Sequence, residues 1–119
     1  MNENVYWVLE LALQPGRLEE FRGLMQEMVA AAKHNEPGTL NYEWNISDDG
    51  AVCHIYVRYE NPAAVMQHMN VFGTKFTDRF AALAQITRLV AYGAANAEVK
   101  AALAPYGAIF MQQFGGFKR

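Results

Sequence analysis

The order of the hydrophobic patterns predicts an α+β fold, a ferredoxin-like split β-α-β arrangement (β-α-β-β-α-β) with a C-terminal helix–strand extension. Two observations carry this prediction. In several segments apolar residues alternate with other residues, which is typical of strands, and in two longer segments they recur three or four positions apart, which is typical of helices. Their order along the chain is that of the split motif. We therefore expect an antiparallel sheet that carries both helices on one face.

The first half of the chain predicts a strand, a helix and a hairpin. Apolar residues alternate from Val5 to Leu13, and Pro15-Gly16 then ends the strand. Helical spacing continues to Asn35, where Pro37-Gly38 prevents continuation. Alternation resumes in two segments joined by a turn at Asp48-Asp49-Gly50. The predicted ranges are strands at 5–13, 39–46 and 51–59 and a helix at 17–35.

The second half predicts a long helix, a strand and the extension. Asn61 can cap the free N–H groups of the helix, and Pro62 suits its first position. Gly73 marks an expected kink, because glycine weakens a helix interior. The predicted ranges are a helix at 62–83, a strand at 86–92, a short helix at 96–103 capped by Asn96, and a fifth strand or extended arm at 106–114.

The composition is that of one domain with a substantial core. The chain has 119 residues, of which 52% are hydrophobic and 18% are charged. We assign residues 1–119 to a single domain, with a core at about 5–92 and an extension at 93–119. Because few residues are charged, we expect an apolar surface that a second copy of the chain covers, as a homodimer.

Several partners and locations are disfavoured by the sequence. The net charge of −2, without a basic run, argues against nucleic-acid binding, and no apolar run approaches the length of a membrane span. The N-terminus lacks a signal-peptide pattern, and the single Cys53 fits a reducing compartment, so we expect a cytoplasmic protein. The three histidines and Cys53 do not have metal-ligand spacing, so no metal site is expected.

His68 is the residue on which the functional interpretation depends. In the predicted helix it lies beside the apolar stripe, one residue before Met69 and four before Phe72. A titratable ring at that edge can face a cavity between helix and sheet and act there as a base. It can equally be a core histidine that is hydrogen-bonded to a carbonyl, and the sequence leaves both readings open.

Four parts of the sequence resemble the antibiotic biosynthesis monooxygenase family. They are Pro15-Gly16 with Phe21 in the following helix, Glu36 to Glu43 (EPGTLNYE), the Asp48-Asp49-Gly50 turn, and Tyr59 to His68. The resemblance extends over about residues 5–92 and implies a dimeric α+β barrel, in which two sheets pack face to face.

The chain departs from the family pattern at two places. Members often carry Glu at the position of Val57, so a hydrogen bond from that side chain is not available here. Haem-degrading members have an axial histidine where this chain has Asp78-Arg79, which disfavours a haem role.

The resemblance implies a quinol-type oxygenation without a metal or flavin, because the substrate itself passes an electron to O₂. No cofactor is therefore expected. The protein must bind a flat aromatic molecule, accept a proton and exclude water. The candidates are His68 as base, Asn41 or Tyr59 for the developing oxyanion, and Trp7, Trp44, Phe72 and Phe76 as aromatic walls.

Each candidate also has an ordinary structural explanation. The aromatic residues can be core packing, Asn41 can be a solvated strand residue, and Tyr59 can simply end its strand. Three functions therefore stay open: a cofactor-independent monooxygenase acting on an aromatic or quinol-like compound, a non-catalytic dimeric module that binds a small ligand, and an isomerase with His68 as proton shuttle. Only the first consumes O₂.

Overall fold

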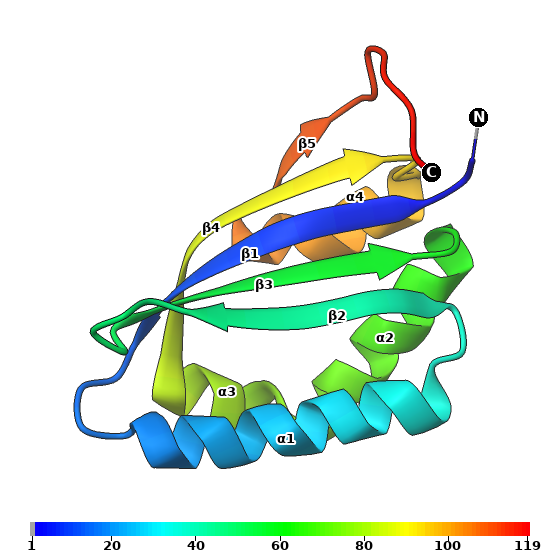
Figure 1. Ribbon diagram of the computed structural model, residues 1–119. Helices are drawn as coiled ribbons and strands as arrows, with labels where there is room; N and C mark the ends of the chain where they lie inside the picture. The colour runs from blue at the N-terminus through cyan, green and yellow to red at the C-terminus, as the bar shows by residue number, and fades with distance from the viewer. Residues whose placement is uncertain (1) are drawn as a thin grey trace.

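The protein folds into one five-stranded sheet with helices on one face, as Figure 1 shows for a computed structural model that describes residues 2–119. The strands are β1 (Val5–Leu13), β2 (Thr39–Ile46), β3 (Val52–Tyr59), β4 (Ala84–Gly93) and β5 (Ile109–Met111). The helices are α1 (Leu18–Asn35), α2 (Pro62–Lys75), α3 (Thr77–Leu83) and α4 (Ala97–Leu103), followed by a 3₁₀ turn at Ala104–Tyr106. The predicted α+β ferredoxin-like fold is confirmed.

The sheet has the order β2-β3-β1-β4-β5. β1 lies in the centre and pairs antiparallel with β3 and β4, and β2 pairs antiparallel with β3. Because side chains alternate along a strand, each strand contributes to two different faces. Val5, Trp7 and Leu11 on β1 are buried against the helices, and their neighbours on β1 point to the other face, which we call the outer face.

The second predicted helix is in fact two helices, and the expected kink at Gly73 is wrong. The chain bends three residues later, at Phe76, whose φ and ψ are −123° and −14°. Gly73 is exposed, with no atom near the place where a Cβ would stand, so nothing in the packing requires glycine there. The bend redirects α3 while keeping Phe72, Phe76 and Phe80 buried, so core packing rather than local propensity sets its position.

The extension begins as predicted and then differs. Asn96 caps α4, accepting a hydrogen bond of 2.9 Å from the Val99 N–H. The fifth strand is only Ile109–Met111, shorter than the predicted 106–114, and it runs parallel to β4. The 3₁₀ turn at Ala104–Tyr106 and the left-handed Gly107 (φ 73°) delay its start.

The core has two halves that meet in the middle of the helix-covered face. One half lies between the sheet and helices α1 and α3, and the other between the sheet, α2 and α4. Leu9 and Tyr42 pack against both halves. Within the described part of the chain, no helix is long and apolar enough to span a membrane.

Candidate functional site

A small cavity lies where the two halves of the core meet. Its volume is about 60 Å³, and it lies between the helix-covered face of the sheet, α1, α2, α3 and the end of α4. Most of its wall is apolar, including Trp7, Leu9, Met28, Ile55, Phe72 and Leu89. His68 contributes the imidazole ring in this wall, and it is accompanied by the phenols of Tyr42 and Tyr106.

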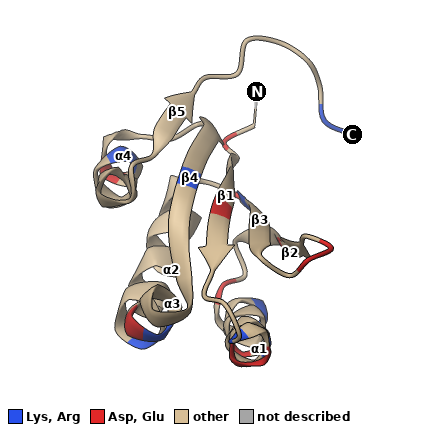
Figure 2. Cartoon of the chain, turned by 90° about the vertical axis from the view of Figure 1, so that its left-hand side faces the viewer, with Lys and Arg blue, Asp and Glu red and all other residues tan. Residues whose placement is uncertain are grey.

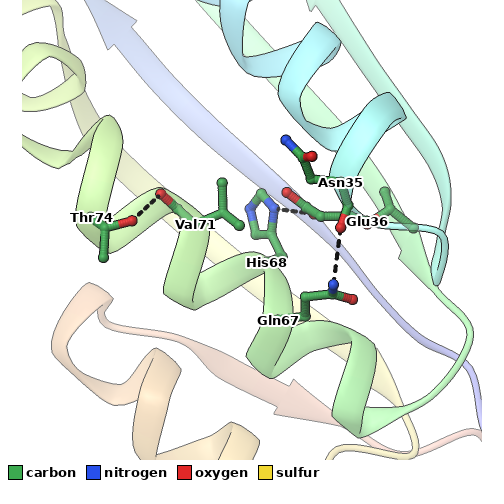
Figure 3. Close-up of polar contacts among 7 residues, drawn as sticks. Asn35, Glu36, Gln67, His68, Val71 and Thr74 are labelled. Atoms are coloured by element: carbon green, nitrogen blue, oxygen red, sulfur yellow. Dashed lines mark hydrogen bonds and ion pairs between the residues drawn. The ribbon is translucent and has the colours of Figure 1, made fainter.

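His68 is held by a buried carboxylate. Its Nδ1 lies 2.8 Å from Oε1 of Glu36, and the exposed fractions of the two side chains are 12% and 2%. The Thr39 hydroxyl donates to the same oxygen over 3.0 Å. Glu36 lies in the loop that follows α1, whereas His68 lies in the middle of α2, and Figure 3 shows the two side chains pointing toward one another.

The loop that carries Glu36 is fastened to α2 by further contacts. The Gln67 side chain donates a 2.9 Å hydrogen bond to the Asn35 carbonyl, one residue before Glu36 (Figure 3). Gly38 allows the loop to come this close, because a Cβ on Gly38 would stand 2.5 Å from the Ala64 Cβ. The pair is therefore positioned by backbone packing as well as by its own attraction.

The surroundings of Glu36 keep it ionised. Burial raises the pKa of the Glu36 carboxyl, but the hydrogen bond and charge of His68, together with the Thr39 hydroxyl, outweigh this and leave the pKa below its ordinary value. A carboxylate on Nδ1 fixes the proton of neutral His68 on that nitrogen. The other ring nitrogen, Nε2, has no hydrogen bond from residues 2–119 and is available as a proton acceptor.

Aromatic rings surround the imidazole. Trp7, Tyr42, Tyr59 and Phe72 have ring centroids between 5.4 and 6.5 Å from that of His68. The Tyr59 hydroxyl is fully buried and has no hydrogen-bond partner within residues 2–119. Burial, Tyr42 and Glu36 raise the pKa of Tyr59, so the hydroxyl keeps its proton and can donate a hydrogen bond at neutral pH.

The structure brings some of the sequence candidates together and separates others. His68, Trp7 and Phe72 all line the cavity. Tyr59 packs directly behind Trp7, with ring centroids 4.9 Å apart, and also contacts His68.

The other three candidates lie away from the cavity wall. Trp44 packs against Phe21, and Phe76 is part of the core beside α1. Asn41 pairs in register with Arg58 on the outer face, and its side chain donates to Glu43 over 3.1 Å. The sheet therefore separates Asn41 from His68.

Sequence reasoning did not single out Glu36 as a functional residue. An acid next to Pro-Gly in a polar loop normally faces solvent, yet Glu36 is 3% exposed. Its only sequence signal is its place in the segment Glu36 to Glu43, which carries part of the family resemblance. Its burial depends on contact with a helix that follows about 30 residues later, which no local pattern reports.

Other reactive groups are not arranged for a metal or a nucleophile. Within residues 2–119 no three His, Cys, Asp or Glu side chains are grouped so that they could hold a metal ion. Cys53 is buried in the core, and burial raises the pKa of its thiol to about 11, so it remains a thiol at neutral pH.

The sequence matches the family model described as "Antibiotic biosynthesis monooxygenase" over residues 4–71. The chain belongs to the antibiotic biosynthesis monooxygenase family. Membership indicates a function on small molecules, either monooxygenase-like or binding, and it does not determine the substrate. The matched segment contains Trp7, Glu36, Tyr59 and His68, and it ends before α3 and the extension.

Solved structures share the fold at low sequence identity. MupZ from Pseudomonas fluorescens has a TM-score of 0.86 and 20% identity, covering 99% of this chain and 96% of that chain. A putative antibiotic biosynthesis monooxygenase from Bacteroides thetaiotaomicron has a TM-score of 0.65 and 20% identity, covering 80% and 90%. One from Nitrosomonas europaea has a TM-score of 0.67 and 15% identity, covering 78% and 91%. Among curated proteins, no sequence matches the chain.

Proposed function

We propose that the protein is a cofactor-independent monooxygenase that oxidises a small phenol or quinol, with His68 as the base. The observation that carries this proposal is the Glu36–His68 pair, buried at the edge of an apolar cavity with Nε2 unpartnered. A base fixed in one tautomer by a buried carboxylate is poised to accept a proton from a bound hydroxyl group. The aromatic rings around it suit a flat substrate.

The proposed reaction converts a phenol with a free para C–H, together with O₂, into a quinone and water. Nε2 takes the hydroxyl proton, and the phenolate gives one electron to O₂. The resulting radical and superoxide combine, with the proton from His68, to a hydroperoxide at the para carbon. Loss of the para hydrogen as a proton, with departure of the outer peroxide oxygen as water, leaves the second carbonyl. In this scheme the substrate supplies all the electrons.

Two neighbouring groups have supporting roles in this proposal. Glu36 stabilises the imidazolium that forms when His68 takes the proton, and it keeps the ring oriented. Tyr59 lies behind the cavity wall, and in this proposal its otherwise unpartnered hydroxyl turns toward a bound substrate and donates to the phenolate oxygen. The apolar wall of the cavity limits access of water to the radical pair.

Cavity size limits the part of the substrate that can be held beside His68. A cavity of roughly 150 Å³ is known to take benzene, whereas the space here is about 60 Å³. Met28 and Met69 lie in the wall, and their unbranched side chains can change rotamer to admit a ring. We therefore propose that a single ring enters the cavity, rather than a fused polycycle.

The test is oxygen uptake by metal-free protein with a panel of single-ring phenols that have a free para C–H, such as phenol, 2-methoxyphenol and 3-methoxyphenol. We expect uptake above the uncatalysed rate, and His68→Ala should lower it by about 10²- to 10⁴-fold, the usual contribution of a general base. The matched control is His54→Ala, because His54 also lies beside a glutamate but on the outer face, and it should leave uptake unchanged. Circular dichroism of each variant shows whether it is folded.

The outcomes separate the three functions that the sequence leaves open. Uptake that survives His68→Ala would remove His68 from the chemistry. If turnover continues without oxygen but is lost in His68→Ala, the protein is an isomerase that uses His68 as a proton shuttle, and the oxygenase proposal is wrong. Binding of the phenols without turnover, retained in His68→Ala, would make the protein a non-catalytic binding module.

We also propose that two copies associate through their outer faces as a homodimer. Val8, Tyr56 and Val90 lie at the centre of this face, and the side chains of Val52, Ile109 and Met111 at its edges are exposed by between 39% and 53%. Figure 2 shows charged residues gathered on α1, α3, α4 and the β2–β3 hairpin, with isolated ones on the sheet. Light scattering should give a dimer mass at micromolar concentration and a monomer mass for Val8→Lys, whereas a stable wild-type monomer would overturn the proposal.

A further inference from the structure

A second, larger hollow adjoins the cavity that contains His68. Its volume is about 700 Å³, and it lies between the end of β1, the start of β4, α3 and the 3₁₀ turn at Ala104–Tyr106. Four residues line both spaces: Phe72, Phe80, Ile86 and Tyr106. We refer to the space at His68 as the inner cavity and to the larger space as the outer hollow. The two spaces are thus separated from one another only by side chains that line both of them.

The outer hollow is uncharged but not purely apolar. Gln14, Thr77 and Gln85 bring amide and hydroxyl groups to a wall that is otherwise built from residues such as Leu13, Ala81 and Ala84. No Asp, Glu, Lys or Arg lines either space within the described residues. Neutral donors and acceptors on an apolar wall suit ether, hydroxyl or carbonyl groups on a chain, and they offer no partner for a charged group.

Tyr106 lies at the junction of the two spaces. It is half-buried at the end of the 3₁₀ turn, and the left-handed Gly107 then directs the chain away toward β5. The same stretch gives Leu103 to the inner cavity and Pro105 to the outer hollow, whereas Tyr106 lines both. The extension therefore supplies part of the wall of each space as well as the side chain that lies between them.

We propose that the substrate is an elongated, uncharged molecule that occupies both spaces, with one aromatic ring beside His68 and a neutral polar chain in the outer hollow. Tyr106 sets the boundary between ring and chain and so determines which head groups fit. This inference rests on the proposed function, because it takes the inner cavity as the reaction site. It is supported by the contrast in volume, since the inner cavity alone is small for a ligand and the adjoining hollow is more than large enough for a chain.

The experiment compares two probes with the same head group by isothermal titration calorimetry. The short probe is 4-methoxyphenol, and the long probe is 4-[2-(2-methoxyethoxy)ethoxy]phenol, which adds a neutral ether chain. With wild-type protein we expect the long probe to bind at least tenfold more tightly than the short one. Ala81→Trp, which fills the outer hollow from α3, should reduce this ratio to about one. Ala82→Trp is the matched control, because Ala82 is also exposed on α3 but does not line the hollow, and it should keep the wild-type ratio.

The outcomes distinguish this inference from the proposed function. The inference would be wrong if the two probes bound wild-type protein equally, or if the long probe still bound more tightly than the short one in Ala81→Trp. Either result would leave the proposed function intact. Binding of neither probe would overturn the proposed function, and the inference with it.

A separate variant tests the role of Tyr106. Tyr106→Ala should merge the two spaces, so that the two-ring probe 6-methoxy-2-naphthol gains at least tenfold in affinity relative to 4-methoxyphenol. An unchanged ratio in a folded variant would show that Tyr106 does not determine the size of the head group.

Discussion

Two histidine–glutamate pairs lie on opposite faces of the same sheet, and they differ in the distance between their atoms and in the exposure of their side chains. His54 and Glu10 lie on the outer face, with Nε2 and Oε1 3.7 Å apart and side chains 48% and 31% exposed. His68 and Glu36 lie on the helix-covered side, 2.8 Å apart, with 12% and 2% exposed. The comparison teaches that a titratable pair acquires a chemical role from what encloses it. Solvent screens the first pair, whereas the second has a fixed tautomer and borders a cavity.

Removing each glutamate gives the largest contrast between the two pairs. Glu36→Ala leaves the His68 Nδ1–H and the Thr39 hydroxyl without an acceptor inside the protein. At about 1–3 kcal/mol for each of these two unsatisfied groups, we expect the free energy of unfolding to fall by roughly 2–6 kcal/mol. Glu10→Ala should change it by less than about 0.5 kcal/mol, because that pair is exposed. Urea denaturation measures both, and equal losses would show that enclosure does not distinguish the pairs.

The second prediction tests how the enclosed pair is positioned. Gly38→Ala puts a Cβ 2.5 Å from the Ala64 Cβ, so the loop that carries Glu36 must move or α2 must shift. Overpacking of this kind costs about 1–3 kcal/mol. In the double variant Gly38→Ala, Ala64→Gly the clash is removed, although glycine within a helix costs up to about 1 kcal/mol itself.

A double-mutant cycle on unfolding free energy provides the measurement for this contact. A favourable coupling between the two substitutions is expected, because the second relieves the strain that the first creates. Strictly additive losses would mean that Gly38 is not needed for the approach of the loop to α2.

The alternation of side chains could be predicted from the sequence, and with it the fold. Alternation along the segment 51–59 puts Cys53, Ile55, Val57 and Tyr59 on one face of their strand, and all four are buried against the helices. The same alternation places Asn41 and Tyr42 on opposite faces of the sheet, yet the pattern cannot tell which face borders a cavity.

Features set by long-range contacts could not be predicted. Glu36 follows no periodic pattern and is buried only because α2 packs over its loop. The bend at Phe76 and the short parallel strand β5 likewise depend on how α3 and the extension pack, since the local sequence is compatible with continued helix or a longer strand.

The third prediction concerns the acid side of the stability profile. The pKa of Glu36 in the folded protein lies below its ordinary value of 4.5, so Glu36 contributes stability that is fully present above that pH and is lost as the pH falls through the folded value. Glu36→Gln keeps a side-chain oxygen but cannot titrate. Below about pH 4.5, the unfolding free energy of the wild type should therefore fall more steeply with pH than that of Glu36→Gln. The difference between the two slopes should be less than about 1.4 kcal/mol per pH unit, which is the limit for one proton.

This comparison isolates Glu36 from the other acids. The pKa values of Glu20, Glu27 and Asp49 are also lowered by their hydrogen-bond partners, but these residues are present in both proteins and cancel in the difference. Denaturant titrations at several pH values give the two slopes. Parallel curves would show that the ionised state of Glu36 contributes nothing to the folded state.

The smallest expected change in stability comes from two tyrosines on the same strand that face opposite ways. Tyr56 on the outer face accepts a 3.3 Å hydrogen bond from Arg58, and Tyr56→Phe should cost no more than about 1 kcal/mol. Tyr59 has a buried hydroxyl without a partner, so Tyr59→Phe should leave the unfolding free energy unchanged or raise it by up to about 1 kcal/mol.

The same substitution should weaken binding of 4-methoxyphenol, because a hydroxyl that the folded protein leaves unpaired is available to the ligand. A loss of stability without a loss of binding would mean that Tyr59 already has an internal partner, such as a bound water, and that its hydroxyl belongs to the core rather than to the site.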